Sequence, residues 1–184
     1  MKNRTIQTIT LGLIVSILIA SPAYAKSTIV GDIILLGNVE RSGHKLLNDA
    51  SVFEGDSIRT DKDSGGVLRV AGGRLEIGES SEIEVLRQNP LKIALKTGTL
   101  GLNFPKGTVL EIETPQLEVY SSPGDKSLSA VVNATPKTED RFQSRSGDFR
   151  VIERQKNGKT SHIMPGQIIV AALLPAVALS PAAL

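Results

Sequence analysis

The chain has 184 residues, with no cysteine, no tryptophan, and 21 basic against 19 acidic side chains. The absence of cysteine excludes a disulfide scaffold and a thiolate nucleophile, and it argues against a zinc site. Lys2 and Arg4 supply the whole surplus of positive charge, so the remainder of the chain is balanced. A neutral chain offers no electrostatic basis for nucleic-acid binding, which needs a clustered basic surface.

The first 25 residues have the pattern of a secretory signal peptide. Lys2 and Arg4 form a short basic start, an apolar run follows over 11–20, and a small-residue cleavage pattern ends at Ala25. A membrane-spanning helix needs about 20 apolar residues, so this run is too short to cross a bilayer. An uncleaved N-terminal anchor is the alternative, and the order of charge, apolar run and cleavage pattern favours the signal peptide.

We therefore expect three segments along the chain. Residues 1–25 form a signal peptide removed after Ala25, residues 26–174 form one domain, and residues 175–184 form a flexible tail. No cysteine is present for lipid attachment, and no Arg-Arg pair indicates twin-arginine export. The pattern predicts a bacterial protein exported to the periplasm or beyond, with no stable membrane insertion of the mature chain.

Apolar and polar residues alternate along most of the chain after residue 60. A period of two is typical of half-buried β-strands, whereas an amphipathic helix has a period of 3.6. The predicted strands of this kind are 68–70, 75–77, 91–95, 100–104 and 117–119.

Turn residues separate the predicted strands at short intervals. Asn157-Gly158 is the clearest case, because a type I′ hairpin turn needs positive φ at both central residues. It predicts a hairpin between strands at 148–154 and 160–163. The polar stretch 133–145 is expected to be an exposed loop, and the apolar run 168–174 is expected to be the last strand.

Many short strands with few helix signals predict an all-β fold in a single domain. Two architectures fit the pattern equally at this level. One is a coiled arrangement of the β-solenoid or β-roll kind, and the other is a sandwich of two packed sheets.

Glycines and aliphatic residues recur at fixed offsets over residues 29–86. The pattern is Gly37-x-Val39-x-Arg41-x-Gly43, then Phe53-x-Gly55-Asp56-x-Ile58-x-Thr60, then Leu68-x-Val70-x-Gly72-Gly73-x-Leu75-x-Ile77-Gly78. This pattern resembles the FecR-type domain of bacterial envelope proteins. FecR proper joins a cytoplasmic anti-sigma segment, one spanning helix and a periplasmic domain. The resemblance here covers the exported domain and neither of the other parts, so it implies an exported all-β binding domain.

Turn chemistry is sufficient to explain the central motif of that resemblance. Gly55 permits the positive φ of a tight turn, and Asp56 can accept backbone N–H groups across it. Ile58 is expected in the core and Thr60 at a strand edge. Together with Gly72 and Gly73, these residues are interpreted as a structural family motif.

The sequence gives no sign of a catalytic, cofactor or metal site. The segment 61–72 fails as a calcium-binding EF-hand loop, because Gly65 and Gly72 occupy positions where oxygen ligands are needed. Carboxylates two residues apart, as at Glu82 and Glu84 or Glu111 and Glu113, share one strand face and are typical of the solvated side of a sheet. We expect no enzyme activity and no cofactor.

Two functions remain. The first is a periplasmic binding or signalling module that recognises another envelope protein, by a route such as pairing with an exposed sheet edge. The second is a structural β-domain associated with the cell envelope or the extracellular matrix.

Overall fold

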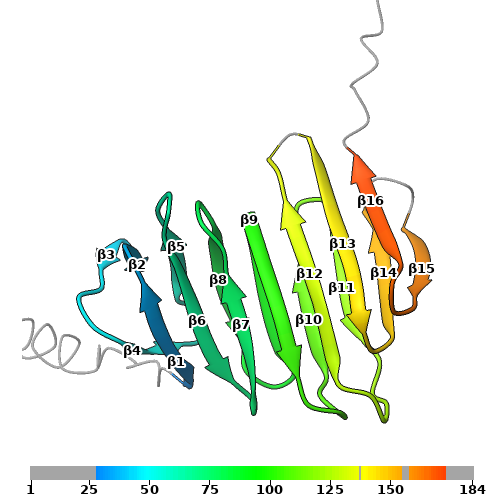
Figure 1. The fold of residues 1–184 in the computed structure, drawn as a ribbon, viewed down its shortest axis with the longest axis horizontal. Coiled ribbons are helices and arrows are strands. Elements are labelled where there is room, and N and C mark those ends of the chain that lie inside the picture. Colours follow the sequence, from blue (N-terminus) through cyan, green and yellow to red (C-terminus); the bar gives the residue numbers. More distant parts are fainter. Residues whose placement is uncertain (1–27, 137, 155–157, 173–184) are drawn as a thin grey trace, which may run out of the picture.

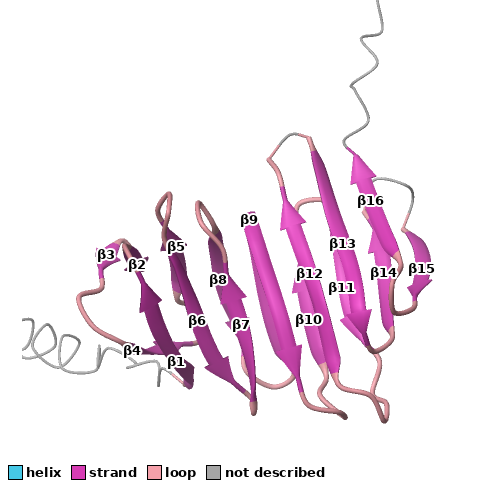
Figure 2. Ribbon diagram, viewed as in Figure 1, coloured by secondary structure: helices cyan, strands magenta, loops and turns pink. Residues whose placement is uncertain are grey.

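The computed structural model describes residues 28–136, 138–154 and 158–172, and within these ranges every regular element is a β-strand (Figure 2). The strands are β1 (Ile29–Leu36), β2 (Val39–Arg41), β3 (His44–Lys45), β4 (Ala50–Phe53), β5 (Ser57–Thr60), β6 (Gly65–Val70), β7 (Gly73–Ile77), β8 (Glu82–Arg87), β9 (Leu91–Phe104), β10 (Leu110–Glu113), β11 (Leu117–Ser121), β12 (Leu128–Ala134), β13 (Glu139–Ser146), β14 (Phe149–Glu153), β15 (Lys159–Ile163) and β16 (Ile168–Ala172).

The strands form two layers that pack face to face (Figure 1). Sheet A has the order β4-β1-β6-β7-β9-β12-β13-β16, and sheet B has the order β3-β2-β5-β8-β9-β10-β11-β14-β15. Within the described ranges all pairs are antiparallel except β9 with β10. The all-β prediction is confirmed, and the two layers have the character of a sandwich.

Strand β9 belongs to both sheets. Its first half pairs with β8 and β10 in sheet B, and its second half pairs with β7 and β12 in sheet A. Leu110 lies beside Leu91, although only a short turn separates it from Phe104. A straight strand of this length would span about 43 Å, while six chain steps reach at most about 22 Å. Strand β9 therefore bends between its two halves as it passes from sheet B to sheet A.

The bend occurs at Gly98, which has φ +92°. A Cβ atom placed on this residue would lie 2.2 Å from the Ser81 hydroxyl oxygen and 2.5 Å from the Ser81 Cα. The Ser81 hydroxyl in turn accepts the Thr99 N–H at 3.0 Å. Both the backbone conformation and the close approach of Ser81 require glycine here.

The core lies between the two sheets and is made of the inward half of each alternating strand. In β9, Leu91, Ile93 and Leu95 face inward from sheet B, and Leu100, Leu102 and Phe104 face inward from sheet A, with at most 3% exposure each. Phe142 and Phe149 meet edge to face across the sheets with ring centroids 5.0 Å apart. The alternation seen in the sequence is thus the burial pattern of a sandwich.

One predicted loop is wrong. Residues 133–145 contribute to strands β12 and β13, which pair directly, so only residues 135–138 connect them. The polar residues of this stretch mislead because β13 carries them on its outer face, at Arg141, Gln143 and Arg145, while Phe142 packs inward. The expected signal peptide with its Ala25 cleavage point and the expected tail lie outside the described residues, as does Asn157.

Candidate functional site

Strand β16 forms an open edge of sheet A. It pairs with β13 on one side, and no strand of the described residues pairs with the other side. Its sequence is Ile-Ile-Val-Ala-Ala, which contains no charged residue, no proline and no glycine. An edge of this kind presents unpaired backbone N–H and C=O groups to any strand that can approach.

The other three edges are protected in ways that natural sheets commonly use. Strand β3 has two residues, and β15 carries Lys159 and His162. Strand β4 is covered at its centre, because the Arg41 guanidinium donates to the Ser51 carbonyl. Among the four edges of the described strands, β16 therefore offers the longest backbone that is uncharged and uncovered by any described residue.

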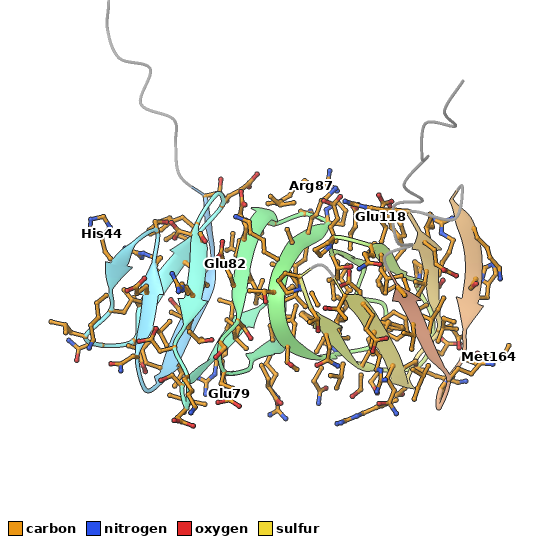
Figure 3. The ribbon with its side chains drawn as sticks, turned by 90° about the horizontal axis from the view of Figure 1, so that it is seen from above. His44, Glu79, Glu82, Arg87, Glu118 and Met164 are labelled. Carbon is orange, nitrogen blue, oxygen red and sulfur yellow. The ribbon has the colours of Figure 1, made fainter. Side chains whose placement is uncertain are left out.

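Apolar side chains are also exposed at this edge. Ile168 is 52% exposed and Val170 is 39% exposed, while Met164 in the preceding turn is 64% exposed. Figure 3 places Met164 at one end of the molecule and His44 at the other. Exposed apolar residues that gather on one segment are typical of contact surfaces, whereas single ones are normal anywhere.

The turn motif of residues 53–60 is built around the Asp56 carboxylate. One oxygen accepts the Phe53 N–H at 2.9 Å, and the other accepts the Ser42 hydroxyl at 2.9 Å. The Arg41 Nε lies 3.7 Å from the same carboxylate. Gly55 has φ +90°, and its N–H donates to the Val85 carbonyl. These contacts occupy the carboxylate within the fold, so it is not presented to a ligand.

The two other residues of this motif serve the packing of β5. Ile58 is fully buried between the sheets. Thr60 is 2% exposed, and its hydroxyl donates to the Gly78 carbonyl and accepts the Ser81 N–H at 2.9 Å. Thr60 thereby ties the end of β5 to the turn that precedes β8.

Gly72 and Gly73 lie at the tight turn between β6 and β7. Ala71 and Gly72 have φ of +50° and +73°, the combination of a two-residue hairpin turn of type I′. A Cβ atom on Gly73 would lie 2.3 Å from the Phe104 ring and 2.7 Å from the Asn103 carbonyl oxygen. These glycines let β7 approach β9 closely at this end of the sheet.

The paired carboxylates on the outer face of sheet B are bound to basic side chains. Lys92 contacts both Glu111, at 2.9 Å, and Glu113. Arg87 and Arg154 contact the same pair from the two sides, each at 3.5 Å. In sheet B, Lys96 likewise contacts Glu82 and Glu84 at 3.3 and 3.0 Å. Each carboxylate pair thus shares a lysine, which fits a structural ladder better than acid–base catalysis.

These carboxylate–lysine pairs, together with Glu118, Tyr120, Arg87 and Arg154, form a charged ladder on sheet B. Burial and hydrogen bonding raise the pKa values of three of its groups. Burial raises the pKa of Tyr120 to about 12, and its bond to Glu118, at 2.9 Å, acts in the same direction. Hydrogen bonding to Glu113 and Glu111 raises the pKa of Lys92, and bonding to Glu84 raises the pKa of Lys96. Figure 3 shows Arg87 and Glu118 on the same side of the molecule.

Other chemical groups lie apart from one another. His44 is exposed on β3 and His162 is exposed on β15, at opposite ends of sheet B. No group of three or more histidine, aspartate or glutamate side chains that could hold a metal is found in the described part of the chain. The described residues also contain no helix that could cross a membrane.

Sequence reasoning missed a buried polar group between the sheets. Asp140, expected in an exposed loop, is fully buried, and one of its carboxylate oxygens accepts the Gln116 N–H at 2.8 Å. Gln116 is 2% exposed. The strand alternation around Phe142 was the available signal, because it places residue 140 on the inward face.

Comparison with known proteins supports the fold alone. No protein-family profile and no curated protein matches the sequence. Two crystal structures, at 2.50 and 1.65 Å, each of a provisionally assigned anti-sigma factor from Parabacteroides distasonis ATCC 8503, align with a TM-score of 0.53 and 13% identity. Each alignment covers 63% of this chain and 54% of the other chain, so this chain spans about half the length of those proteins. The chain is thus similar in fold to part of these proteins.

Proposed function

We propose that this chain is an exported, non-catalytic module that binds an extended segment of another bacterial envelope protein along β16. The observation that carries the proposal is the edge itself, which is uncharged, is uncovered by any described residue and includes the exposed Ile168 and Val170. Strand addition would satisfy the backbone groups of β16, and the alternate side chains would select among partners.

The chemical groups of the described residues favour binding over catalysis. The carboxylate pairs are held by Lys92 and Lys96, and the two histidines lie on separate edges. The fold likeness to a provisionally assigned anti-sigma factor also favours a signalling role. The sequence pattern of residues 1–25 supports export, and the FecR resemblance supports a role in the envelope.

The test attaches a photo-crosslinking side chain at position 168 in living bacteria, with position 109 as the matched control. Val109 is 45% exposed but lies in the turn before β10, away from the edge. We expect one envelope protein to be captured from position 168 and not from position 109. Mass spectrometry of the captured chain should show a mature N-terminus at Lys26.

A substitution then tests whether capture depends on strand pairing. Val170→Lys places a charge on the open edge, and we expect it to reduce capture by about tenfold or more. Val109→Lys should leave capture within about twofold. In the purified complex, the amides of β16 should exchange with solvent more slowly than in the free protein.

The structural role predicts a different result. If the purified protein associates with itself, and Val170→Lys abolishes that association, the edge joins copies of this chain and the partner-binding proposal is wrong. Equal capture from positions 168 and 109 would also contradict it.

A further inference from the structure

The cleft beside the β6–β7 turn brings two arginines together on the outer face of sheet A. Arg69, Gly72, Gly73, Arg74 and Asn103 line this space, which has a volume of about 300 Å³. Arg69 and Arg74 are direct cross-strand partners, and Arg74 is the partner of Asn103 on β9. The lining therefore carries two positive charges and a side-chain amide, with no carboxylate.

The side chain of Arg69 does not use the carboxylate nearest to it in register. Asp32 is its direct partner on β1, yet Asp32 accepts the Ser51 hydroxyl at 2.9 Å. Arg69 makes no ion pair or side-chain hydrogen bond with any described residue. Like charges placed directly opposite on a hairpin are destabilising, and here Arg74 has a counter-ion in Glu76 while Arg69 has none among the described residues.

Arg74 forms an ion pair with a residue of its own strand. Its Nε lies 3.0 Å from Glu76, which stands outside the cleft lining. Its side chain is 56% exposed, so much of the guanidinium is open to solvent. Solvent-exposed guanidinium N–H groups can donate to the oxygens of a tetrahedral or planar anion.

Gly73, which lines the cleft, lets β7 approach β9 closely. A Cβ at this position would run into the Phe104 ring and the Asn103 carbonyl. The missing Cβ would point inward to buried Phe104, on the opposite face of the sheet from the Arg74 side chain. The Asn103 side chain is exposed at the same level of the sheet.

We propose that this cleft is a binding site for a phosphate group, held between Arg69 and Arg74 with the Asn103 amide as an additional donor. A phosphate monoester carries close to two negative charges above pH 7, so two arginines attract it more strongly than they attract a singly charged carboxylate. Binding would convert the repulsion between the two guanidinium groups into two charge-assisted contacts. This site is independent of the β16 edge.

The experiment is a titration of the purified protein with inorganic phosphate at pH 7.5, followed by ¹H–¹⁵N NMR at constant ionic strength. We expect saturable shifts of the Arg69 and Arg74 Nε–H signals and of the Asn103 side-chain amide. Acetate at the same ionic strength should bind at least several-fold more weakly. Lowering the pH from 7.5 to about 6 should weaken phosphate binding, because inorganic phosphate gains a proton over this range.

Matched substitutions locate the site. Arg69→Gln and Arg74→Gln should each weaken phosphate binding by about tenfold, the loss expected for a charge-assisted contact. Arg59→Gln and Arg145→Gln change exposed arginines elsewhere and should leave the affinity within about twofold. Thermal unfolding of each variant checks that these surface changes leave the fold intact.

Vesicles identify the source of the phosphate group. A lipid headgroup is indicated if the protein binds phosphatidylcholine vesicles only when they contain phosphatidic acid, and if Arg69→Gln abolishes that binding. A free phosphate is indicated if the protein binds inorganic phosphate but not these vesicles. The proposal is overturned if Arg59→Gln weakens phosphate binding as much as Arg69→Gln does. It is equally overturned if acetate binds as well as phosphate, or if no saturable shift occurs at the cleft.

Discussion

Gly98 is the residue on which the joining of the two sheets depends. Its φ of +92° is a conformation that residues with a side chain rarely adopt. The Ser81 backbone and hydroxyl lie where a Cβ would have to be. A glycine in another turn can have a positive φ without any atom lying where its Cβ would be.

That difference gives a quantitative prediction. Gly98→Ala should lower the free energy of unfolding by about 3 kcal/mol, since strained backbone and overpacking both contribute. Gly107→Ala is the control, because Gly107 has φ +78° with nothing within 4 Å of the added atom. It should cost about 1 kcal/mol, the conformational part alone. Urea unfolding measures both, and equal losses would contradict the assigned role of Ser81.

Individual residues were predictable from the sequence where a local rule governs them. The turn glycine at position 55 and the buried Ile58 follow from spacing and alternation alone. Gly98 looked like any other turn glycine, because the approach of Ser81 comes from a distant part of the chain. Asp140 was misplaced because its polarity outweighed its position in the alternation.

At the scale of elements, the charged ladder of sheet B links neighbouring strands on their solvent side. Glu118 on β11 accepts the Tyr120 hydroxyl and lies 3.0 Å from the Arg154 Nε. The Arg150 guanidinium lies 4.9 Å from the centre of the Tyr120 ring. Exposed ion pairs contribute little singly, so the ladder matters mainly as a connected set.

The ladder predicts a loss of stability at alkaline pH. The pKa of Tyr120 is raised from 10.0 to about 12, and that of Lys92 is raised above 10.5, so the folded state holds these protons more tightly than the unfolded state does. The stabilisation is therefore complete below about pH 10 and is lost as the pH rises towards 12. Urea unfolding between pH 9 and 12 should show the fall.

Two substitutions assign this pH dependence. Tyr120→Phe and Lys92→Met should each make the free energy of unfolding vary less steeply between pH 10 and 12. Lys126→Met is the control, since Lys126 is exposed and makes no ion pair with a described residue. A slope that is unchanged in Tyr120→Phe would show that the ladder does not govern alkaline unfolding.

Strand positions were predictable because alternation is a local property, and the pattern over 68–104 matches β6, β7 and β9 closely. Strand neighbours were not predictable, since β16 pairs with β13 and β9 with four other strands. The candidate edge therefore could not be found from the sequence, although its strand could. A strand is an edge when no other strand pairs with one of its sides, and this depends on the topology of the whole sheet.

At the scale of the whole molecule, shared pairing through β9 predicts that the sandwich unfolds as one unit. Ile83 in sheet B and Val132 in sheet A are both fully buried, on opposite sides of β9. Ile83→Ala and Val132→Ala should each destabilise by about 2–4 kcal/mol. We expect a single urea transition in both variants, with amide exchange rates rising together in β1–β8 and in β10–β16.

Independent halves would give a different pattern. If Ile83→Ala raised exchange in β1–β8 while β10–β16 kept the protection of the unsubstituted protein, the two halves would be separate cooperative units. Coincident transitions by circular dichroism and Tyr120 fluorescence would support a single unit.

The continuous path of β9 also has a mechanical consequence. A pulling force that separates the β1–β8 half from the β10–β16 half must act across the ladders on both sides of this strand. Those hydrogen bonds lie in two layers and along one uninterrupted backbone, so the load is shared between the sheets before any pair can yield. A domain tethered between envelope components would in this way keep its edge strand in place under tension.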